Sequence, residues 1–180
     1  MLVDEKRYTV QEFEQVAALP ENADRMFELI NGEIIEVSPG TTRNSEISYR
    51  IAILVHQFCQ EQQIPFYVSG GDGAYRIGDH VIAPDFAYKR TPMSAEYPDP
   101  VPPAWAVEII SPSDKATSIR EKRQIYRDAG ILLWEVYPQT QLVDIYAPSQ
   151  TERTVSADGV LDGGAVLPGF SLPVQQLFTA

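Results

Sequence analysis

The chain has 180 residues, of which 44% are hydrophobic, and it carries a formal net charge of −11. This size and composition suit one globular domain with its own core, and they argue against a disordered chain. No stretch has the length of apolar sequence that a membrane-spanning helix needs, and the charged segment Met1–Tyr8 lacks the apolar region of a signal peptide. The only cysteine, Cys59, cannot form an internal disulfide and fits a reducing compartment. We therefore expect a cytoplasmic protein with no membrane association and a single domain over residues 1–180.

The negative charge bears on the partners of the protein. Proteins that bind nucleic acids usually present a basic surface, because each phosphate contact releases counterions. The chain has fourteen lysines and arginines, and five of them lie in one short segment: Lys115, Arg120, Lys122, Arg123 and Arg127. This segment is locally positive in an acidic protein. The alternative is a solvated helix face with internal ion pairs, which composition alone favours.

In the first third of the chain, three patterns predict secondary structure. Thr9 followed by Glu12 is a capping box that opens a helix ending near Leu19. Asn31-Gly32 between two alternating apolar runs predicts a β-hairpin. From about residue 44 to residue 62, apolar side chains recur at helical spacing and predict a long amphipathic helix.

The remainder of the chain alternates between strand-like runs and one further helix. The segment Trp105–Ile110 is apolar on both faces except for one acid, as in a central covered strand, and Gly130 ends the helix that follows. The tail Leu167–Phe170 is expected to dock its apolar residues on the core. These patterns predict an α/β fold, a single domain with a central mixed β-sheet flanked by helices. Strands are predicted over Phe66–Ser69, Ala74–Ile77, Val81–Tyr88, Trp105–Ile110, Ile131–Tyr137 and Leu142–Tyr146, a loop over Thr91–Pro103, and the helix over Lys115–Ala129.

Two acidic residues stand in places where a hydrophobic core has no need of them. Asp85 follows a proline that interrupts a strand-like run, and Glu108 lies inside the most apolar strand of the chain. An ionised carboxylate in such surroundings is unfavourable unless it is paired or bound to a metal. A structural role is also open, since Glu108 could accept hydrogen bonds from an arginine or from loop backbone.

The helix after this strand carries a lysine on its apolar face. Ile119, Lys122, Tyr126 and Ala129 are spaced three, four and three residues apart, so they share one side of the helix. A lysine on a buried stripe indicates a negative partner, and a short loop joins the helix to the Glu108 strand. The alternative is that the stem of Lys122 packs on the core while its ammonium group reaches water.

Two carboxylates and one lysine suit phosphodiester hydrolysis. Carboxylate oxygens are ligands for Mg²⁺ or Mn²⁺, which lowers the pKa of a bound water and neutralises charge on a phosphate. A neighbouring lysine can orient the attacking water or stabilise the transition state. Asp85, Glu108 and Lys122 are therefore the candidate catalytic residues, with Asp85 and Glu108 as candidate metal ligands.

Other chemistry finds little support in the sequence. Two histidines, His56 and His80, are too few for a zinc triad. The chain has no Gly-x-Ser-x-Gly nucleophile motif, no P-loop and no dinucleotide-binding fingerprint.

The order of the motifs resembles a large bacterial family of restriction-endonuclease-like proteins within the PD-(D/E)xK nuclease superfamily. The resemblance extends over nearly the whole chain, and its parts are specific in combination rather than singly. They are Phe27-Glu28-Leu29-Ile30-Asn31-Gly32-Glu33, Ile82-Ala83-Pro84-Asp85, Val107-Glu108-Ile109-Ile110-Ser111-Pro112-Ser113, Lys122-x-x-x-Tyr126-x-x-x-Gly130-x-x-x-Trp134 and Leu167-Pro168-Gly169-Phe170.

The resemblance implies a metal-dependent nuclease of the restriction-endonuclease-like fold that acts on DNA rather than RNA. The superfamily pattern has its lysine two residues after the second acid, where this chain has Ile110, and the family supplies it from the following helix, where Lys122 matches. The resemblance also implies that the backbone carbonyl of Ile109 is a metal ligand and that Glu33 is an auxiliary acid; the alternative is that Glu33 is an exposed residue of the hairpin. Tyr126 is an auxiliary residue on the Lys122 face of the helix.

One departure from the family pattern concerns Asn44, which stands where many members have a histidine. An amide can form hydrogen bonds but cannot take up a proton as imidazole does.

The sequence as a whole leaves three interpretations open: a Mg²⁺-dependent endonuclease, a nuclease-fold protein that binds DNA without cutting it, and a scaffold in which Glu108 and Lys122 form a buried ion pair. A homodimer is expected for the first, because two symmetric sites cut both strands of double-stranded DNA most simply.

Overall fold

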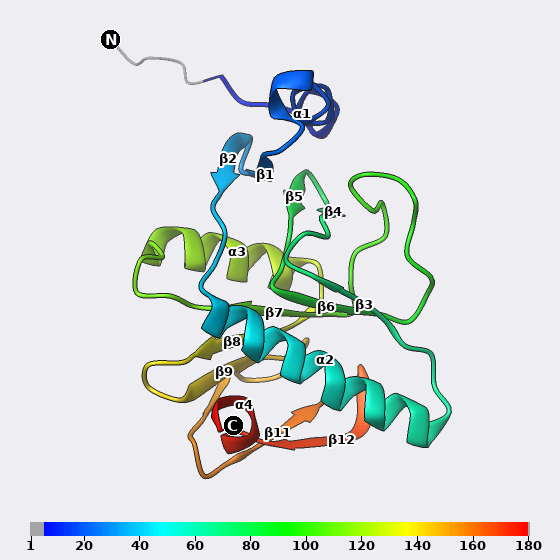
Figure 1. The fold of residues 1–180 in the computed structure, drawn as a ribbon, viewed down its shortest axis with the longest axis vertical. Helices are drawn as coiled ribbons and strands as arrows, with labels where there is room; N and C mark the ends of the chain where they lie inside the picture. Colours follow the sequence, from blue (N-terminus) through cyan, green and yellow to red (C-terminus); the bar gives the residue numbers. More distant parts are fainter. Residues whose placement is uncertain (1–5, 180) are drawn as a thin grey trace.

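The computed structural model describes residues 6–179, so Met1–Glu5, which belong to the segment expected to lack a signal peptide, lie outside the described residues. Its centre is a six-stranded sheet with the strand order β10-β9-β8-β7-β6-β3 (Figure 1). Strands β7 and β8 are parallel and every other neighbouring pair is antiparallel, which confirms the predicted mixed sheet. The strands are β3 (Tyr67–Gly70), β6 (Phe86–Lys89), β7 (Trp105–Ile109), β8 (Leu132–Tyr137), β9 (Leu142–Tyr146) and β10 (Arg153–Val155).

Two helices cover opposite faces of this sheet, α2 (Thr42–Gln62) on one side and α3 (Ala116–Asp128) on the other (Figure 1). Side chains alternate along β7, so Trp105 and Val107 pack in the α2 core and Ala106 packs with α3. Both helices were predicted from their apolar periodicity, and both predictions are confirmed to within two residues at each end. Gly130, at φ +67°, lies just beyond the end of α3 in the left-handed conformation that glycine favours.

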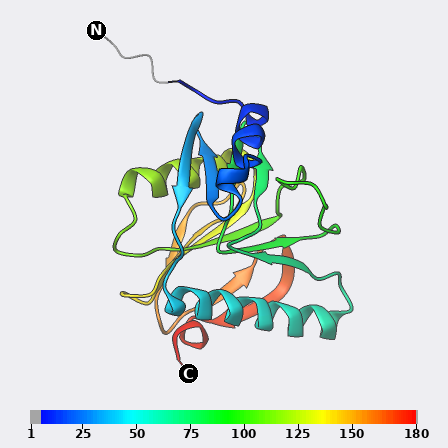
Figure 2. The same ribbon diagram turned by 45° about the horizontal axis from the view of Figure 1, so that its top comes forward.

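A second, smaller sheet rises from the α3 side of the molecule, with the order β2-β1-β5-β4 (Figures 1 and 2). Its strands are β1 (Met26–Ile30), β2 (Glu33–Val37), β4 (Tyr75–Ile77) and β5 (His80–Ile82). Asn31 and Gly32 have φ values of 51° and 80°, the conformation that a tight hairpin turn requires, so the predicted hairpin is confirmed. A short helix, α1 (Val10–Ala17), lies at the outer end, and its predicted capping box is present.

The single strand predicted over Val81–Tyr88 is wrong. The chain leaves the small sheet after Ile82 and enters the six-stranded sheet at Phe86, so the run is divided between β5 and β6. Pro84 has no backbone N–H to donate to a strand ladder, and residues 83–85 form the break. The break matters because Asp85 is its last residue.

The C-terminal part contains elements that the sequence patterns did not predict. After β10, the strands β11 (Val160–Gly163) and β12 (Leu167–Pro173) form a separate hairpin, followed by the short helix α4 (Gln175–Phe178). Leu167 and Phe170 are buried in the α2 core, as expected for the docked tail. None of the helices in the described part of the chain is long and apolar enough to span a membrane.

Candidate functional site

Asp85 is held rigidly at the junction of the two sheets. Its Oδ2 accepts a hydrogen bond of 2.7 Å from the backbone N–H of Ile109, at the end of β7. The hydroxyl of Ser48 on α2 donates a 2.6 Å hydrogen bond to the backbone carbonyl of Asp85. The break after β5 thus places the carboxylate beside the end of the strand that carries Glu108.

Glu108 faces α3, because it lies two residues after Ala106 in β7 and therefore on the same face of the strand, which this helix covers. Its Oε1 accepts a 2.6 Å hydrogen bond from the hydroxyl of Tyr126, and its Oε2 lies 3.4 Å from Nζ of Lys122. The sequence predicted that Lys122 and Tyr126 share the inward face of the helix, and both side chains reach the same glutamate. Asp85, Glu108 and Lys122 therefore come together, as the sequence reasoning required.

A further acid, Glu28, is the closest partner of the lysine. Its Oε1 lies 2.8 Å from Nζ of Lys122, nearer than Glu108, and it also accepts a 3.0 Å hydrogen bond from the N–H of Ala83. Glu28 is on β1 in the small sheet and is 3% exposed. Sequence reasoning passed over it, although the signal was the same as for Glu108: a single acid within an apolar run.

The remaining predicted residues differ in how they relate to this cluster. Asn44, in the first turn of α2, donates a 3.2 Å hydrogen bond from Nδ2 to the backbone carbonyl of Ile109. That carbonyl is the one expected to bind metal, and a carbonyl oxygen has a second lone pair available. Glu33 is exposed on β2, and within residues 6–179 it forms no hydrogen bond or ion pair with Asp85, Glu108 or Lys122. The auxiliary acid that contacts the lysine is Glu28 rather than Glu33.

The electrostatics of the cluster follow from burial and from its excess of acids. The pKa of Glu108 is raised to about 7, chiefly by burial and also by the nearby charges of Asp85 and Glu28, while Lys122 and the hydroxyl of Tyr126 oppose the shift. Burial likewise raises the pKa of Asp85, against the N–H of Ile109 and the charge of Lys122. For Lys122, burial alone would lower the pKa, but Glu108 and Glu28 together raise it well above its usual value. The ammonium group therefore stays protonated.

The cluster holds three carboxylates and one ammonium group, so it lacks positive charge when all are ionised. Within residues 6–179, no three His, Cys, Asp or Glu side chains are arranged so that they alone could hold a metal ion. A cation here would have two carboxylates, Asp85 and Glu108, with a backbone carbonyl and water completing its shell. Mg²⁺ is commonly bound in this way, through one or two carboxylates and several waters. The residues present therefore fit a hard divalent cation.

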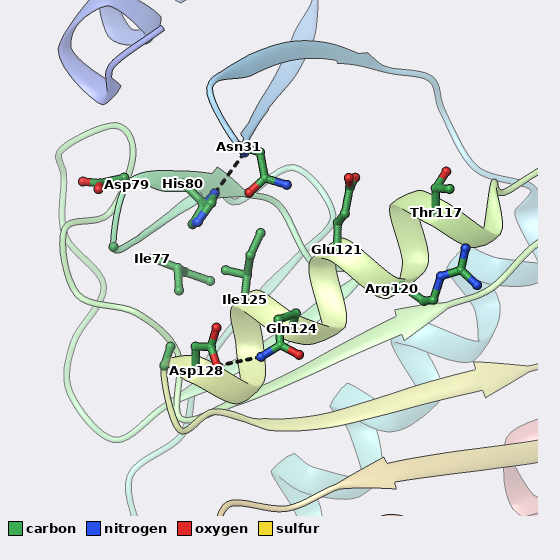
Figure 3. Close-up of a pocket in the computed structure, with 12 residues that line it drawn as sticks. Asn31, Ile77, Asp79, His80, Thr117, Arg120, Glu121, Gln124, Ile125 and Asp128 are labelled. Carbon is green, nitrogen blue, oxygen red and sulfur yellow. Dashed lines mark hydrogen bonds between the residues drawn. The ribbon is translucent and has the colours of Figure 1, made fainter. Parts of the chain in front are cut away.

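A cavity of about 600 Å³ lies next to the cluster but does not include it. It is formed by the outward side of α3 and by the turns that carry Asn31 and His80 (Figure 3). His80 accepts the N–H of Asn31 through its Nδ1 at 3.2 Å, which ties the two turns together. Neither Asp85, Glu108 nor Lys122 lines this cavity, so the charged cluster is the better candidate for chemistry.

The sheet, its two covering helices and the acids at the ends of β6 and β7 define a restriction-endonuclease-like α/β protein. The chain belongs to the Uma2 family, whose description reads "Putative restriction endonuclease" and whose model matches residues 10–175. A crystal structure from Anabaena variabilis, titled as "a putative nuclease belonging to DUF820", superimposes with a TM-score of 0.77. The two chains are 22% identical over 94% of this chain and 97% of the other, which shows a shared fold. A search of curated proteins found no match.

Proposed function

We propose that this protein is a metal-dependent endonuclease that hydrolyses phosphodiester bonds of double-stranded DNA. The observation that carries the proposal is the meeting of Asp85, Glu108 and Lys122 at the junction of two sheets, from three separate elements. The family to which the chain belongs supports a nuclease-like function.

In this proposal, Asp85, Glu108 and the backbone carbonyl of Ile109 would hold Mg²⁺ or Mn²⁺, which would supply Lewis-acid chemistry for a water molecule and for the charge on the scissile phosphate. The protonated Lys122 stabilises negative charge that develops on the phosphate oxygens. Glu28 holds the ammonium group in place, through a contact of 2.8 Å. Tyr126 fixes the rotamer of Glu108 by donating to Oε1, so that Oε2 points toward the lysine.

The wider setting of this activity belongs to the same proposal. Cleavage of both strands calls for two sites related by symmetry, so we propose a homodimer. A lone buried cysteine, Cys59, fits a cytoplasmic protein. The domain extends over residues 1–180.

The direct test is cleavage of a supercoiled plasmid at low salt with Mg²⁺ or Mn²⁺. We expect the wild type to nick or linearise the plasmid and EDTA to abolish this. Asp85→Asn removes a ligand charge and Lys122→Met removes the ammonium group while keeping its stem. Each should lower the cleavage rate by about 10²-fold or more, the usual effect of deleting one group that stabilises a transition state.

The matched control is Glu61→Gln, which removes an acidic charge from the exposed C-terminal end of α2 and should cleave like the wild type. Equal cleavage by all variants would contradict the assignment of the site. DNA binding without cleavage by the folded wild type would favour the second candidate function, a DNA-binding protein of nuclease fold. The observation behind that candidate is Asn44, whose amide contacts Ile109 but cannot take up a proton.

A further inference from the structure

Within the described residues, almost all basic side chains of the chain have an ion-pair or hydrogen-bond partner. Of its fourteen lysines and arginines, twelve form an ion pair or a side-chain hydrogen bond within residues 6–179. The two that form neither within that range are Lys115 and Arg120. Both are exposed.

These two cations lie in the same part of the molecule. Lys115 is the N-cap residue of α3 and Arg120 is in its second turn, on the helix that supplies Lys122 to the charged cluster. Lys115 precedes Lys122 by seven residues, so the two share a helix face about 10 Å apart at 1.5 Å per residue. Figure 3 shows Arg120 on the side of α3 that lines the cavity, toward the N-terminal end of the helix.

The pairing separates the basic segment into two groups. Lys122, Arg123 and Arg127 have carboxylate partners, namely Glu28 and Glu108 for the lysine and Glu135 and Glu152 for the arginines. A cation that already has a carboxylate partner must exchange it before it can bind a phosphate. Lys115 and Arg120 need no such exchange. On a chain with a net charge of −11, the N-terminal half of α3 is therefore where an anionic polymer meets cations that have no carboxylate partner within residues 6–179.

We infer that the N-terminal half of α3 is the surface that binds the backbone of the nucleic-acid substrate, with Lys115 contacting a phosphate of the strand being cut and Arg120, on the outward side of the helix, contacting a second phosphate of the duplex. This inference rests on the proposed function, because it places the substrate beside the cluster of Asp85, Glu108 and Lys122. The contacts position the strand and carry no sequence information. Lys115 shares the face of α3 that carries Lys122, whereas Arg120 lies on the outward side of the helix, where it lines the cavity.

The number of free cations fixes how strongly binding depends on salt. Each phosphate contact on duplex DNA contributes about −0.9 to the slope of log K against log salt concentration, so two contacts predict a slope of about −2. This dependence is shallow, since a protein with six to ten contacts shows a slope of roughly −5 to −9. Because the two cations that lack a partner within residues 6–179 lie on α3, binding of the nucleic-acid backbone is expected at this one helix.

The test is a binding titration of a fluorescently labelled DNA duplex at several KCl concentrations, with Ca²⁺ held constant so that binding is measured without turnover. We expect a slope of about −2 for the wild type, reduced by about 1 in Lys115→Gln and by about 1 in Arg120→Gln. The matched control is Arg127→Gln. Arg127 lies seven residues after Arg120 on the same side of α3, but it is paired with Glu152 at 3.4 Å. Its slope should equal that of the wild type.

Plasmid cleavage measured alongside separates this inference from the proposed function. If the wild type cleaves and the Lys115 and Arg120 variants need more DNA for half-maximal rate while reaching the same maximal rate, both are supported. If the wild type cleaves but these variants bind with its affinity and slope, the inference is wrong and the nuclease stands. A wild-type slope of −5 or steeper would also overturn it. A wild type that neither binds nor cleaves contradicts both.

Discussion

Two glutamates lie next to each other on neighbouring strands of the central sheet, and they differ in how they contact the basic residues of α3. Glu108 on β7 and Glu135 on β8 are register partners, and both side chains meet α3 through consecutive basic residues, Lys122 and Arg123. The guanidinium group of Arg123 donates a hydrogen bond to each carboxylate oxygen of Glu135, at 2.9 and 2.6 Å, and the hydroxyl of Tyr137 donates a third. Lys122 reaches Glu108 only at 3.4 Å.

The difference separates a structural ion pair from a functional one. The pair of Arg123 and Glu135 is balanced in charge, because one guanidinium group faces one carboxylate. Glu135 is only 1% exposed, so little of this pair is accessible to solvent or ions. The Glu108 cluster has three acids to one base, and burial raises the pKa of both Asp85 and Glu108. Perturbed carboxylates with a specific charge partner are typical of functional sites. The comparison therefore predicts that a divalent cation stabilises one cluster and leaves the other unaffected.

The largest expected effect on stability comes from breaking the balanced pair. Arg123→Met leaves the buried carboxylate of Glu135 without its counter-charge, so the free energy of unfolding should fall by about 3–5 kcal/mol. Urea denaturation followed by circular dichroism measures this change. Added Mg²⁺ should stabilise the variant and the wild type by the same amount, because the ion binds at Asp85 and Glu108 and not at Glu135, so the difference between them should remain.

The control for that variant is Arg153→Gln, which breaks an exposed ion pair with Asp162 and should lower stability by less than about 1 kcal/mol. If Mg²⁺ stabilised Arg123→Met more than the wild type and closed the difference between them, the distinction between the two glutamates would be wrong. The distinction would also be wrong if Arg123→Met lost no more stability than Arg153→Gln.

A smaller change in the free energy of unfolding, this time an increase, is expected when Glu108 is replaced by glutamine. The pKa of Glu108 in the folded protein is raised to about 7, so the folded state favours the protonated acid. Without metal, its contribution to stability is complete below about pH 4.5, declines as the pH rises and is lost above about pH 7. Glu108→Gln keeps a neutral side chain, so at pH 8 without metal it should be more stable than the wild type, by roughly 1–3 kcal/mol at 1.4 kcal/mol per pKa unit.

The measurement is thermal unfolding in EDTA from pH 4.5 to pH 8. The melting temperature of the wild type should fall further over this range than that of Glu108→Gln, because the variant has lost the titrating acid. Glu135→Gln is the matched control on the neighbouring strand and should retain the decline of the wild type. Parallel profiles for the wild type and Glu108→Gln would contradict the raised pKa.

Much of the site could be predicted from sequence, because a charge on an apolar stripe is visible in the sequence. Glu108 on β7 and Lys122 on α3 were found in this way, and the periodicity of α2 and α3 gave the layers of the fold. Glu28 shows the limit of this reasoning. Its strand reads as a hairpin arm, and its contact with Lys122 spans 94 residues between two different sheets.

The same limit explains the other differences. The run 81–88 alternates like one strand, and only the separation of the two sheets shows why Pro84 divides it. The C-terminal hairpin consists of two strands whose apolar residues pack against α2, a long-range contact that no local pattern contains. Local propensity predicts elements, whereas packing decides which elements meet.

Calorimetric titration with Mg²⁺ or Mn²⁺ at neutral pH measures whether Asp85 and Glu108 bind a cation. We expect binding by the wild type, loss of binding in Asp85→Asn, and retention in Glu135→Gln, which changes the neighbouring glutamate instead. Thermal unfolding with and without the ion shows in parallel that each variant is folded. If the folded wild type bound neither ion, or if Asp85→Asn bound the ion as the wild type does, the charged cluster would not be a metal site.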